Sequence, residues 1–312
     1  MQSALTDPEV KYNFSGHESF PFRFGWLVKG VQRSLEDNRV FNREDAPIIL
    51  GVGKNMVRSI KYWCSAMGLI TVPQAGTVCV TDMGKLLFAK DGLDPYMEDI
   101  GTLWLLHWLM VRSFEYTSTW YLAFTRFGHV TFTRKQLVEY LLKSARDESP
   151  RTRVTESSMS RDVDVFVRTY VSNTGNRSSA LLEESFDCPL VELGLLEESP
   201  TGVLSFVIGS HPSLPDMILA FALADYWERV HPQQKTLSFE QTIYIDSAPG
   251  AAFKLTENAL VERFERLPEW TGLRFDETAG RRMLIRLNND ADKPSVWPLR
   301  ILRHYYETEG ET

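Results

Sequence analysis

Residues 42–89 decide the predicted fold, and they read NREDAPIILGVGKNMVRSIKYWCSAMGLITVPQAGTVCVTDMGKLLFA. Within them, KNMVRSIKYWCSAM places apolar side chains at three- and four-residue steps, which predicts an amphipathic helix over residues 54–67. A short helix over residues 43–50 precedes it, with Asn42 as the expected N-cap. Gly51-Val52-Gly53 joins the two helices, because glycine readily adopts the left-handed backbone that ends a helix.

A hairpin and a further helix are predicted directly after this pair. Residues 69–72 and 78–80 are short apolar runs around a turn, and Thr81 is positioned to cap a helix over residues 82–89. Short helix, glycine turn, amphipathic helix, hairpin and helix is the order of a winged helix-turn-helix. We therefore expect an α+β, predominantly helical fold, with a winged helix-turn-helix N-terminal domain and a mixed α/β C-terminal domain.

The amphipathic helix has a cationic outer face. Opposite its apolar stripe it carries basic or polar side chains and no carboxylate: Lys54, Asn55, Arg58, Lys61, Tyr62 and Ser65. A solvated face ordinarily mixes both charges, so this lack of acid is informative in a chain of net charge −7. In a winged helix-turn-helix this helix enters the DNA major groove, where Arg58 would read guanine and Asn55 adenine. The lysines would meet phosphates. The alternative is a winged helix used only for protein contacts or for core building.

The composition fits a globular protein with a local binding surface. The chain has 312 residues, 43% hydrophobic and 24% charged, which is enough for two domains and argues against wholesale disorder. Its net charge of −7 excludes a uniformly basic surface. Any contact with double-stranded DNA must therefore come from clustered Lys and Arg side chains.

Cysteine usage and apolar segments favour a cytoplasmic protein. Three widely spaced cysteines without a CxxC pair argue against a disulfide framework or a structural zinc. The most apolar stretch, residues 102–111, is too short for a bilayer, which takes about 20 apolar residues. The first residues lack the basic-then-apolar order of a signal peptide. We expect no membrane contact.

The clearest break in the sequence is SARDESPRTRVTESSMS, residues 144–160, which is polar and nearly free of large apolar residues. It predicts a linker or mobile loop. This divides the chain into a winged helix-turn-helix domain with a helical extension, residues 1–143, and a mixed helical domain, residues 161–312. No internal repeat with a solenoid period is evident.

The C-terminal region contains a possible second winged module. A helix over residues 257–266 precedes LRFDETAGRRMLIRL, which predicts a hairpin turning near residues 278–280. Alternation would direct Met283, Ile285 and Leu287 inward and leave Arg282 and Arg286 on the opposite face. With the basic last helix, this suits a second DNA contact and equally suits docking onto an acidic partner.

Several long motifs resemble one known family. They are FSGHESFPFRFGWLVKG at residues 14–30, LGVGKNMVRSIKYWCSAMGLI at 50–70, DGLDPYMEDIGTLWLLHW at 91–108, HPSLPD at 211–216 and SAPGAAFKL at 247–255. They are similar to the SspB-type family, formerly a domain of unknown function, of bacterial single-strand DNA phosphorothioation systems. The resemblance covers nearly the whole chain. It implies a DNA-nicking endonuclease that acts beside a cysteine desulfurase, an ATPase and an ATP-pyrophosphatase-like protein in phage defence.

Cleavage of a phosphodiester bond requires an activated water and usually Mg²⁺ or Mn²⁺ held by carboxylates. We expect no organic cofactor. Two clusters of residues are candidates for this chemistry. The first is DGLDPYMED, in which Asp94 and Glu98, four residues apart, would share a helix face and a cation, with Asp99 beside them. In the alternative, Asp94 caps a helix beginning at Pro95, and Glu98 and Asp99 complement its dipole. This alternative is favoured because acidic residues are common in the first turn of helices.

The second cluster is GHESFPFRF. Here His17 would serve as general base or ligand, Glu18 would bind metal, and Arg23 would hold phosphate. The alternative is an N-terminal arm that packs its phenylalanines and pairs Glu18 with Arg23. A third acidic pair, Asp162 and Asp164, lies in a strand-like run beside the predicted linker and carries little weight.

Three hypotheses follow from the sequence. The first is a metal-assisted DNA-nicking enzyme, and the second is a non-catalytic DNA-binding subunit that positions a modification complex. The third is an interaction scaffold without DNA contact. The family resemblance favours the first of them.

Overall fold

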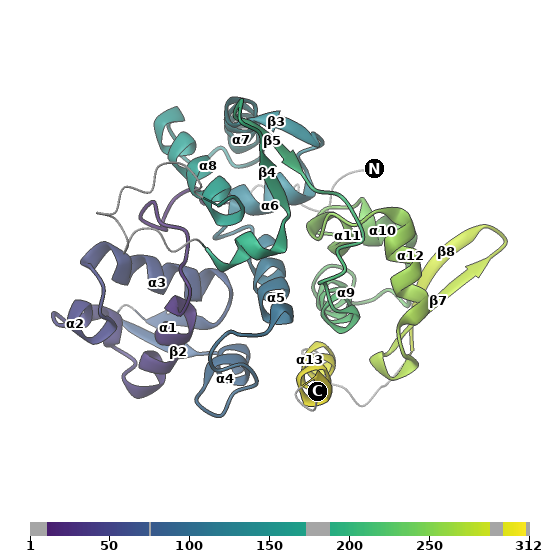
Figure 1. The fold of residues 1–312 in the computed structure, drawn as a ribbon, viewed down its shortest axis with the longest axis horizontal. Helices are drawn as coiled ribbons and strands as arrows, with labels where there is room; N and C mark the ends of the chain where they lie inside the picture. The colour runs from purple at the N-terminus through teal and green to yellow at the C-terminus, as the bar shows by residue number, and fades with distance from the viewer. Residues whose placement is uncertain (1–10, 75, 173–187, 288–295, 310–312) are drawn as a thin grey trace. The chain divides into compact units, whose positions relative to one another are not determined.

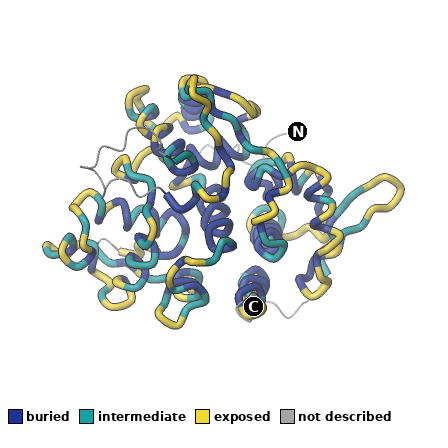
Figure 2. The backbone as a smooth tube through the Cα atoms, in the orientation of Figure 1, coloured by how far each residue is buried: buried dark blue, intermediate teal, exposed yellow. Residues whose placement is uncertain are grey.

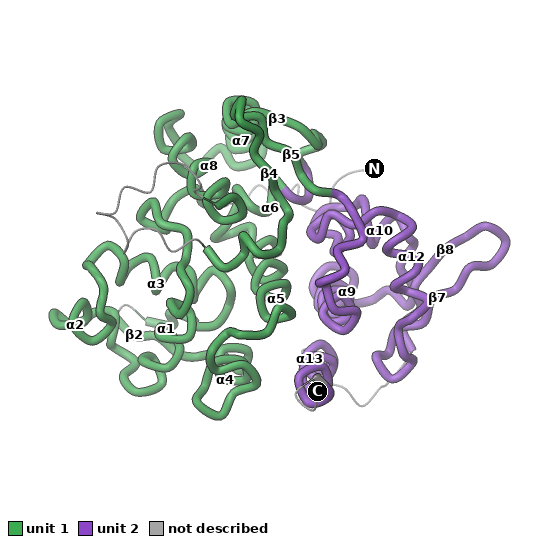
Figure 3. Tube along the Cα trace, viewed as in Figure 1, with its two compact units in different colours: residues 1–123, 127–207 green, residues 124–126, 208–312 purple. Residues whose placement is uncertain are grey.

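The computed structural model describes residues 11–74, 76–172, 188–287 and 296–309. The chain forms two compact units, one of residues 1–123 and 127–207 and the other of residues 124–126 and 208–312 (Figure 3). The described residues form a mostly helical α+β protein with three small antiparallel sheets, as expected (Figure 1). None of the described helices combines the length and apolarity needed to cross a membrane.

The helices and strands predicted for residues 42–89 are present in the predicted order. They are α1 (Trp26–Glu36), a short 3-10 turn η1 (Val40–Asn42), α2 (Ala46–Leu50), α3 (Lys54–Ala66), β1 (Ile70–Gln74), β2 (Thr77–Val80) and α4 (Asp82–Phe88). Thr81 caps α4 by accepting a hydrogen bond from the Gly84 amide, as predicted. The predicted start of the short helix at Arg43 is wrong: α2 begins at Ala46, and the Arg43 guanidinium pairs instead with Asp45 and Asp37.

The apolar stripe of α3 packs against α1. Ile60, Trp63 and Cys64 of α3 are fully buried. Gly30 of α1 lies so close that a β-carbon there would stand 2.5 Å from the Cys64 Sγ, so only glycine fits at this crossing. Burying this stripe leaves the opposite face of α3 toward solvent.

The rest of unit 1 is built around the buried helix α5 (Ile100–Val111), which is dark along its length in Figure 2. After it come α6 (Ser118–Thr125), β3 (Thr131–Thr133), α7 (Arg134–Glu148), α8 (Glu156–Tyr170), the 3-10 turn η2 (Pro189–Leu193), β4 (Leu196–Glu198) and β5 (Val203–Phe206). The predicted linker at residues 144–160 therefore consists largely of the end of α7 and the start of α8, which pack against each other. The chain divides after residue 207, not at this segment.

Unit 2 contains the remaining elements. They are α9 (Asp216–Val230), β6 (Thr236–Ser238), α10 (Phe239–Ile243), α11 (Pro249–Ala252), α12 (Glu257–Arg266), η3 (Glu269–Thr271), β7 (Leu273–Thr278), β8 (Arg281–Arg286) and α13 (Val296–Glu309). The predicted hairpin is present, with β7 and β8 paired from Leu273↔Arg286 to Thr278↔Arg281.

Its predicted inward face is wrong. Leu284 is the fully buried residue of β8, whereas Met283 and Ile285 are half-buried. Because side chains alternate along a strand, Arg282 and Arg286 lie on the packed side with Leu284. There Arg282 stacks over the Phe239 ring at 4.2 Å.

The second and third sheets repeat one arrangement. In each, a three-residue strand leads directly into a helix with a capping box, made by Thr133 and Gln136 in α7 and by Ser238 and Gln241 in α10. A later helix, α8 or α12, is followed by a hairpin whose second strand lies in the centre, giving the strand orders β3-β5-β4 and β6-β8-β7. Together with α2, α3, β1 and β2, the described parts of the chain thus contain three successive helix–helix–hairpin modules.

Candidate functional site

The first half of the outer face of α3 is exposed as its spacing predicts, whereas Tyr62 and Ser65 in its second half are half-buried. Lys54, Asn55 and Arg58 are exposed and Lys61 is half-buried; we call these four side chains the cationic ridge. The Arg58 side chain is 69% exposed. The predicted exposure is thus confirmed for Lys54, Asn55 and Arg58, whereas Lys61 is half-buried. The contact of the ridge with DNA stays a prediction.

A strained loop lies beside the ridge. We call residues 15–19 the arm loop, in which Ser15, Gly16, Glu18 and Ser19 all have positive φ values. A β-carbon on Gly16 would lie 2.8 Å from the Tyr62 ring of α3, so glycine is required there. Non-glycine residues in this backbone region cost about 1–3 kcal/mol each and persist where surrounding contacts fix them, often at functional sites.

A buried carboxylate fixes the arm loop. Asp162 of α8, 1% exposed, accepts hydrogen bonds from the Ser15 amide at 2.8 Å, from His17 Nε2 at 2.6 Å and from the Thr119 hydroxyl. His17 Nδ1 accepts from the Ser19 amide at 3.1 Å. Both His17 nitrogens are therefore engaged within the protein, with the ring proton on Nε2.

The fixed loop brings a carboxylate to the ridge. Glu18 Oε1 lies 3.8 Å from the Arg58 guanidinium, and both side chains are partly exposed. An exposed pair at this distance contributes little to stability, about 0–1 kcal/mol, so it is free to rearrange when a ligand binds. Glu18 therefore forms an ion pair with Arg58. The sequence pattern had suggested Arg23 as its partner.

Two further arginines lie around the arm loop. The Arg23 guanidinium lies over the Phe20 and Trp26 rings at 5.9 and 5.5 Å. Arg168 of α8 donates to the Ser19 carbonyl at 2.8 Å. The pKa of Arg168 is lowered, mainly by burial and also by the positive charge of Arg23. Sequence reasoning missed Arg168, because its helix lay next to a segment interpreted as a linker.

Both helical interpretations of the DGLDPYMED cluster are wrong. Residues 91–99 are not helical, and α5 begins at Ile100 with Asp99 as its N-cap. Asp94 is buried and accepts from the Glu98 and Asp99 amides and from the Thr102 hydroxyl. Glu98 is exposed, so the two acids do not share a helix face. No group of three His, Cys, Asp or Glu residues in the described parts of the chain is arranged to hold a metal ion.

The C-terminal arginines predicted to bind DNA are engaged within unit 2. Arg282 pairs with Glu257 at 3.3 Å, in addition to its stacking on Phe239. The Arg286 guanidinium lies 4.5 Å from the centre of the Trp297 ring. It also pairs with Glu228 at 3.8 Å. These contacts explain why both arginines lie on the packed side of the hairpin.

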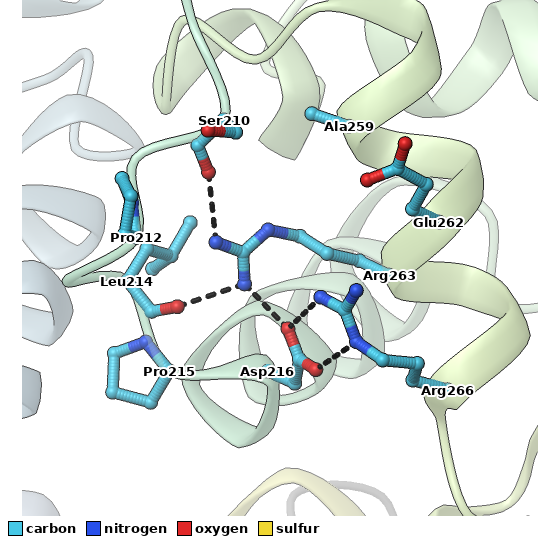
Figure 4. Close-up of a pocket in the computed structure, with 9 residues that line it drawn as sticks. All are labelled: Ser210, Pro212, Leu214, Pro215, Asp216, Ala259, Glu262, Arg263 and Arg266. Atoms are coloured by element: carbon cyan, nitrogen blue, oxygen red, sulfur yellow. Dashed lines mark hydrogen bonds and ion pairs between the residues drawn. The ribbon is translucent and has the colours of Figure 1, made fainter.

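The HPSLPD motif surrounds a buried arginine. Figure 4 shows Arg263 extending from α12 beside a pocket of ≈ 400 Å³, where it donates to the carbonyls of Ser210 and Leu214 and pairs with Asp216. Arg266 pairs with the same carboxylate at 2.9 Å. Burial lowers the pKa of Arg263. This arrangement holds residues 210–216 on α12, which accounts for the motif structurally.

A half-buried lysine predicts pH-dependent stability. Lys254 Nζ donates to the Phe124 carbonyl at 2.7 Å, and burial lowers the pKa of Lys254 from 10.5 to about 7. Between pH 7 and 10.5 the unfolded chain thus binds more protons at this residue, so its contribution to stability rises with pH, by up to about 1.4 kcal/mol per pH unit. Urea unfolding at pH 7, 8 and 9 should show a shallower rise for Lys254→Met; equal slopes would contradict the shift.

Comparisons with known proteins place the chain in a family. It belongs to the family described as "Protein of unknown function (DUF4007)", whose model matches residues 14–306. Two solved structures share its fold, one described as an SspB crystal structure and the other as a magnesium ion-bound SspB crystal structure. Each structure shares 31% sequence identity with this chain and matches it with a TM-score of 0.85. The match covers 98% of this chain and 91% of the chain in the solved structure. The resemblance to SspB proteins is thus confirmed. No curated protein matches the sequence.

Proposed function

We propose that this protein binds duplex DNA through the cationic ridge and nicks it within a phosphorothioate modification and phage-defence system. The observation that carries the proposal is the outer face of α3, on which Lys54, Asn55 and Arg58 are exposed; the helix itself carries no carboxylate. Helix α3 follows a glycine turn and precedes a hairpin, the order of a winged helix-turn-helix. Such a helix fits the major groove, and Lys and Arg side chains neutralise phosphates.

Support for nicking comes from the kinship with SspB proteins, one of which is described as magnesium-bound. Mg²⁺ is commonly held by one or two carboxylates together with substrate phosphates. Glu18 fits that requirement, since it is partly exposed and lies beside the ridge. Bound there, the metal would activate water and polarise the phosphate. Arg23 and Arg58 would hold the DNA strand against the arm loop.

The test separates binding from cleavage. Purified protein with supercoiled plasmid and Mg²⁺ should produce open circles, and EDTA should abolish them. We expect Glu18→Gln to lower nicking on the order of 100-fold through loss of the metal ligand. Its DNA affinity should equal or exceed that of the unmodified protein, because a negative charge beside Arg58 is removed.

Glu98→Gln is the matched control, since Glu98 is an exposed acid of the other candidate cluster. It should nick normally. If Glu98→Gln loses nicking while Glu18→Gln nicks normally, the metal site proposed at Glu18 is contradicted, and residues 94–99 become the metal site.

The second candidate function is a non-catalytic DNA-binding subunit. The 3.8 Å contact between Glu18 and Arg58 favours it, because this carboxylate would then serve to position an arginine of the ridge. Salt-sensitive binding with no nicking at any Mg²⁺ or Mn²⁺ concentration would establish this function in place of the first. Under either function we propose a cytoplasmic protein that works with a cysteine desulfurase, an ATPase and an ATP-pyrophosphatase-like protein.

A further inference from the structure

The three modules carry different charges on equivalent helices. By position before their hairpins, α3, α8 and α12 correspond to one another. The exposed side chains of α3 are basic or neutral, whereas α8 exposes Glu156, Arg161 and Asp164. Helix α12 exposes three glutamates and one arginine: Glu257, Glu262, Glu265 and Arg266. An acidic helix repels phosphates, so the third module is unsuited to place α12 in a DNA groove.

The hairpin of the third module has the opposite character. Cross-strand pairing places Arg274, Asp276, Thr278 and Arg281 on one face, the side opposite Leu284. The two arginines there accompany one half-buried carboxylate, Asp276, which accepts a hydrogen bond from the Thr278 hydroxyl. Lys235, just before β6, lies in the same groove as Arg281. We call Lys235, Arg274 and Arg281 the hairpin cations; all three are exposed, and none forms an ion pair with any described residue.

A groove is lined by residues of β6 and the start of α10 together with residues 280–283 of the hairpin. Its volume is ≈ 590 Å³, and its lining is polar, with the hydroxyls of Thr236 and Ser238 and the amides of Gln234 and Gln241. Two cations without an ion pair among the described residues, Lys235 and Arg281, line it together with one carboxylate, Glu240, whereas Arg282, which also lines it, is paired with Glu257. Hydroxyls, amides and cations are the groups that contact phosphate oxygens in protein–DNA complexes.

We infer that the third module makes a second contact with the DNA backbone through the β7–β8 hairpin, using the hairpin cations and not helix α12. A two-stranded ribbon can approach duplex DNA as a helix does. The contact differs from the one expected from sequence, because Arg282 and Arg286 face the packed side. This inference rests on the proposed DNA binding of the full chain.

The test is the salt dependence of binding, measured with the full chain and a fluorescent duplex. The neutral variant Lys235→Gln/Arg274→Gln/Arg281→Gln should lower affinity roughly 10- to 100-fold at moderate salt. It should also reduce the slope of log K against log salt by about 0.9 per lost phosphate contact. The charge-keeping variant Lys235→Arg/Arg274→Lys/Arg281→Lys should retain both the affinity and the slope.

The outcomes distinguish this inference from the proposed function. If the neutral variant binds with unchanged affinity and slope while Arg58→Ala/Lys61→Ala weakens binding, the hairpin contact is overturned and the ridge stands. If the unmodified chain does not bind duplex even at low salt, both are overturned. Equal weakening in the charge-keeping and neutral variants would show that side-chain shape at the hairpin, and not charge, was responsible, and would also overturn the inference.

Discussion

Replacing Lys54, Arg58 and Lys61 together by glutamate is expected to lower duplex affinity by at least about 100-fold. Each replacement removes a phosphate or base contact worth about 1 kcal/mol or more and adds a charge that repels the backbone. The cationic ridge is solvent-facing, so the melting temperature should change little. Fluorescence anisotropy with a duplex, beside a thermal melt, measures both quantities.

The matched control is the same charge reversal on another helix. Lys135, Lys143 and Arg146 are exposed on α7, and their replacement by glutamate changes the net charge equally. If the two triple variants lose affinity alike, binding responds to overall charge, and α3 has no special role. A selective loss in the α3 variant supports major-groove docking.

The second large effect is expected at Asp162. Asp162→Ala removes the acceptor for the Ser15 amide, His17 Nε2 and the Thr119 hydroxyl, leaving three donors without that acceptor in a buried site. Breaking such a buried network costs about 3–5 kcal/mol. Urea unfolding followed by tryptophan fluorescence should detect the loss, and limited proteolysis should show earlier cleavage near the arm loop.

Asp164→Asn is the control for this effect. Asp164 lies two residues away on the same helix, but its side chain is 56% exposed and pairs with Arg134 at 3.4 Å. Its replacement should cost less than about 1 kcal/mol. Similar destabilisation by both substitutions would contradict the role assigned to Asp162 as the anchor of the arm loop.

The N-terminal module was predictable because local signals agree there. The apolar positions of α3 follow helical spacing, Gly51 ends α2 in the left-handed conformation, and Thr81 caps α4. Each of these signals acts over a few residues, so the sequence pattern alone contains it. The exposure of the cationic ridge follows from the same spacing.

Helix α8 was missed because its stability comes from distant contacts. Its buried positions Met159, Asp162, Val163 and Phe166 have helical spacing, but an acid interrupts the apolar stripe. That acid is buried because it binds His17, 145 residues away in the chain. No local pattern contains such a partner, so Asp162 and Asp164 looked like an exposed pair in a strand.

The face of the C-terminal hairpin was mispredicted for a related reason. Polarity patterns assign arginine to solvent, yet Arg282 and Arg286 lie over the rings of Phe239 and Trp297. An arginine can place its stem and guanidinium plane on an aromatic surface while keeping an ion pair. The rings come from α10 and α13, so this arrangement depends on tertiary packing.

The long separation between His17 and Asp162 has a consequence during synthesis. The arm loop emerges from the ribosome early, but its anchor follows 145 residues later. At a translation rate of roughly 5–20 residues per second, on the order of ten seconds pass before His17 can form its hydrogen bond with Asp162. We expect the carboxylate of Glu18 to reach its place beside Arg58 only once α8 has been translated and folded. A nascent fragment ending before α8 would thus carry the ridge without a correctly positioned arm.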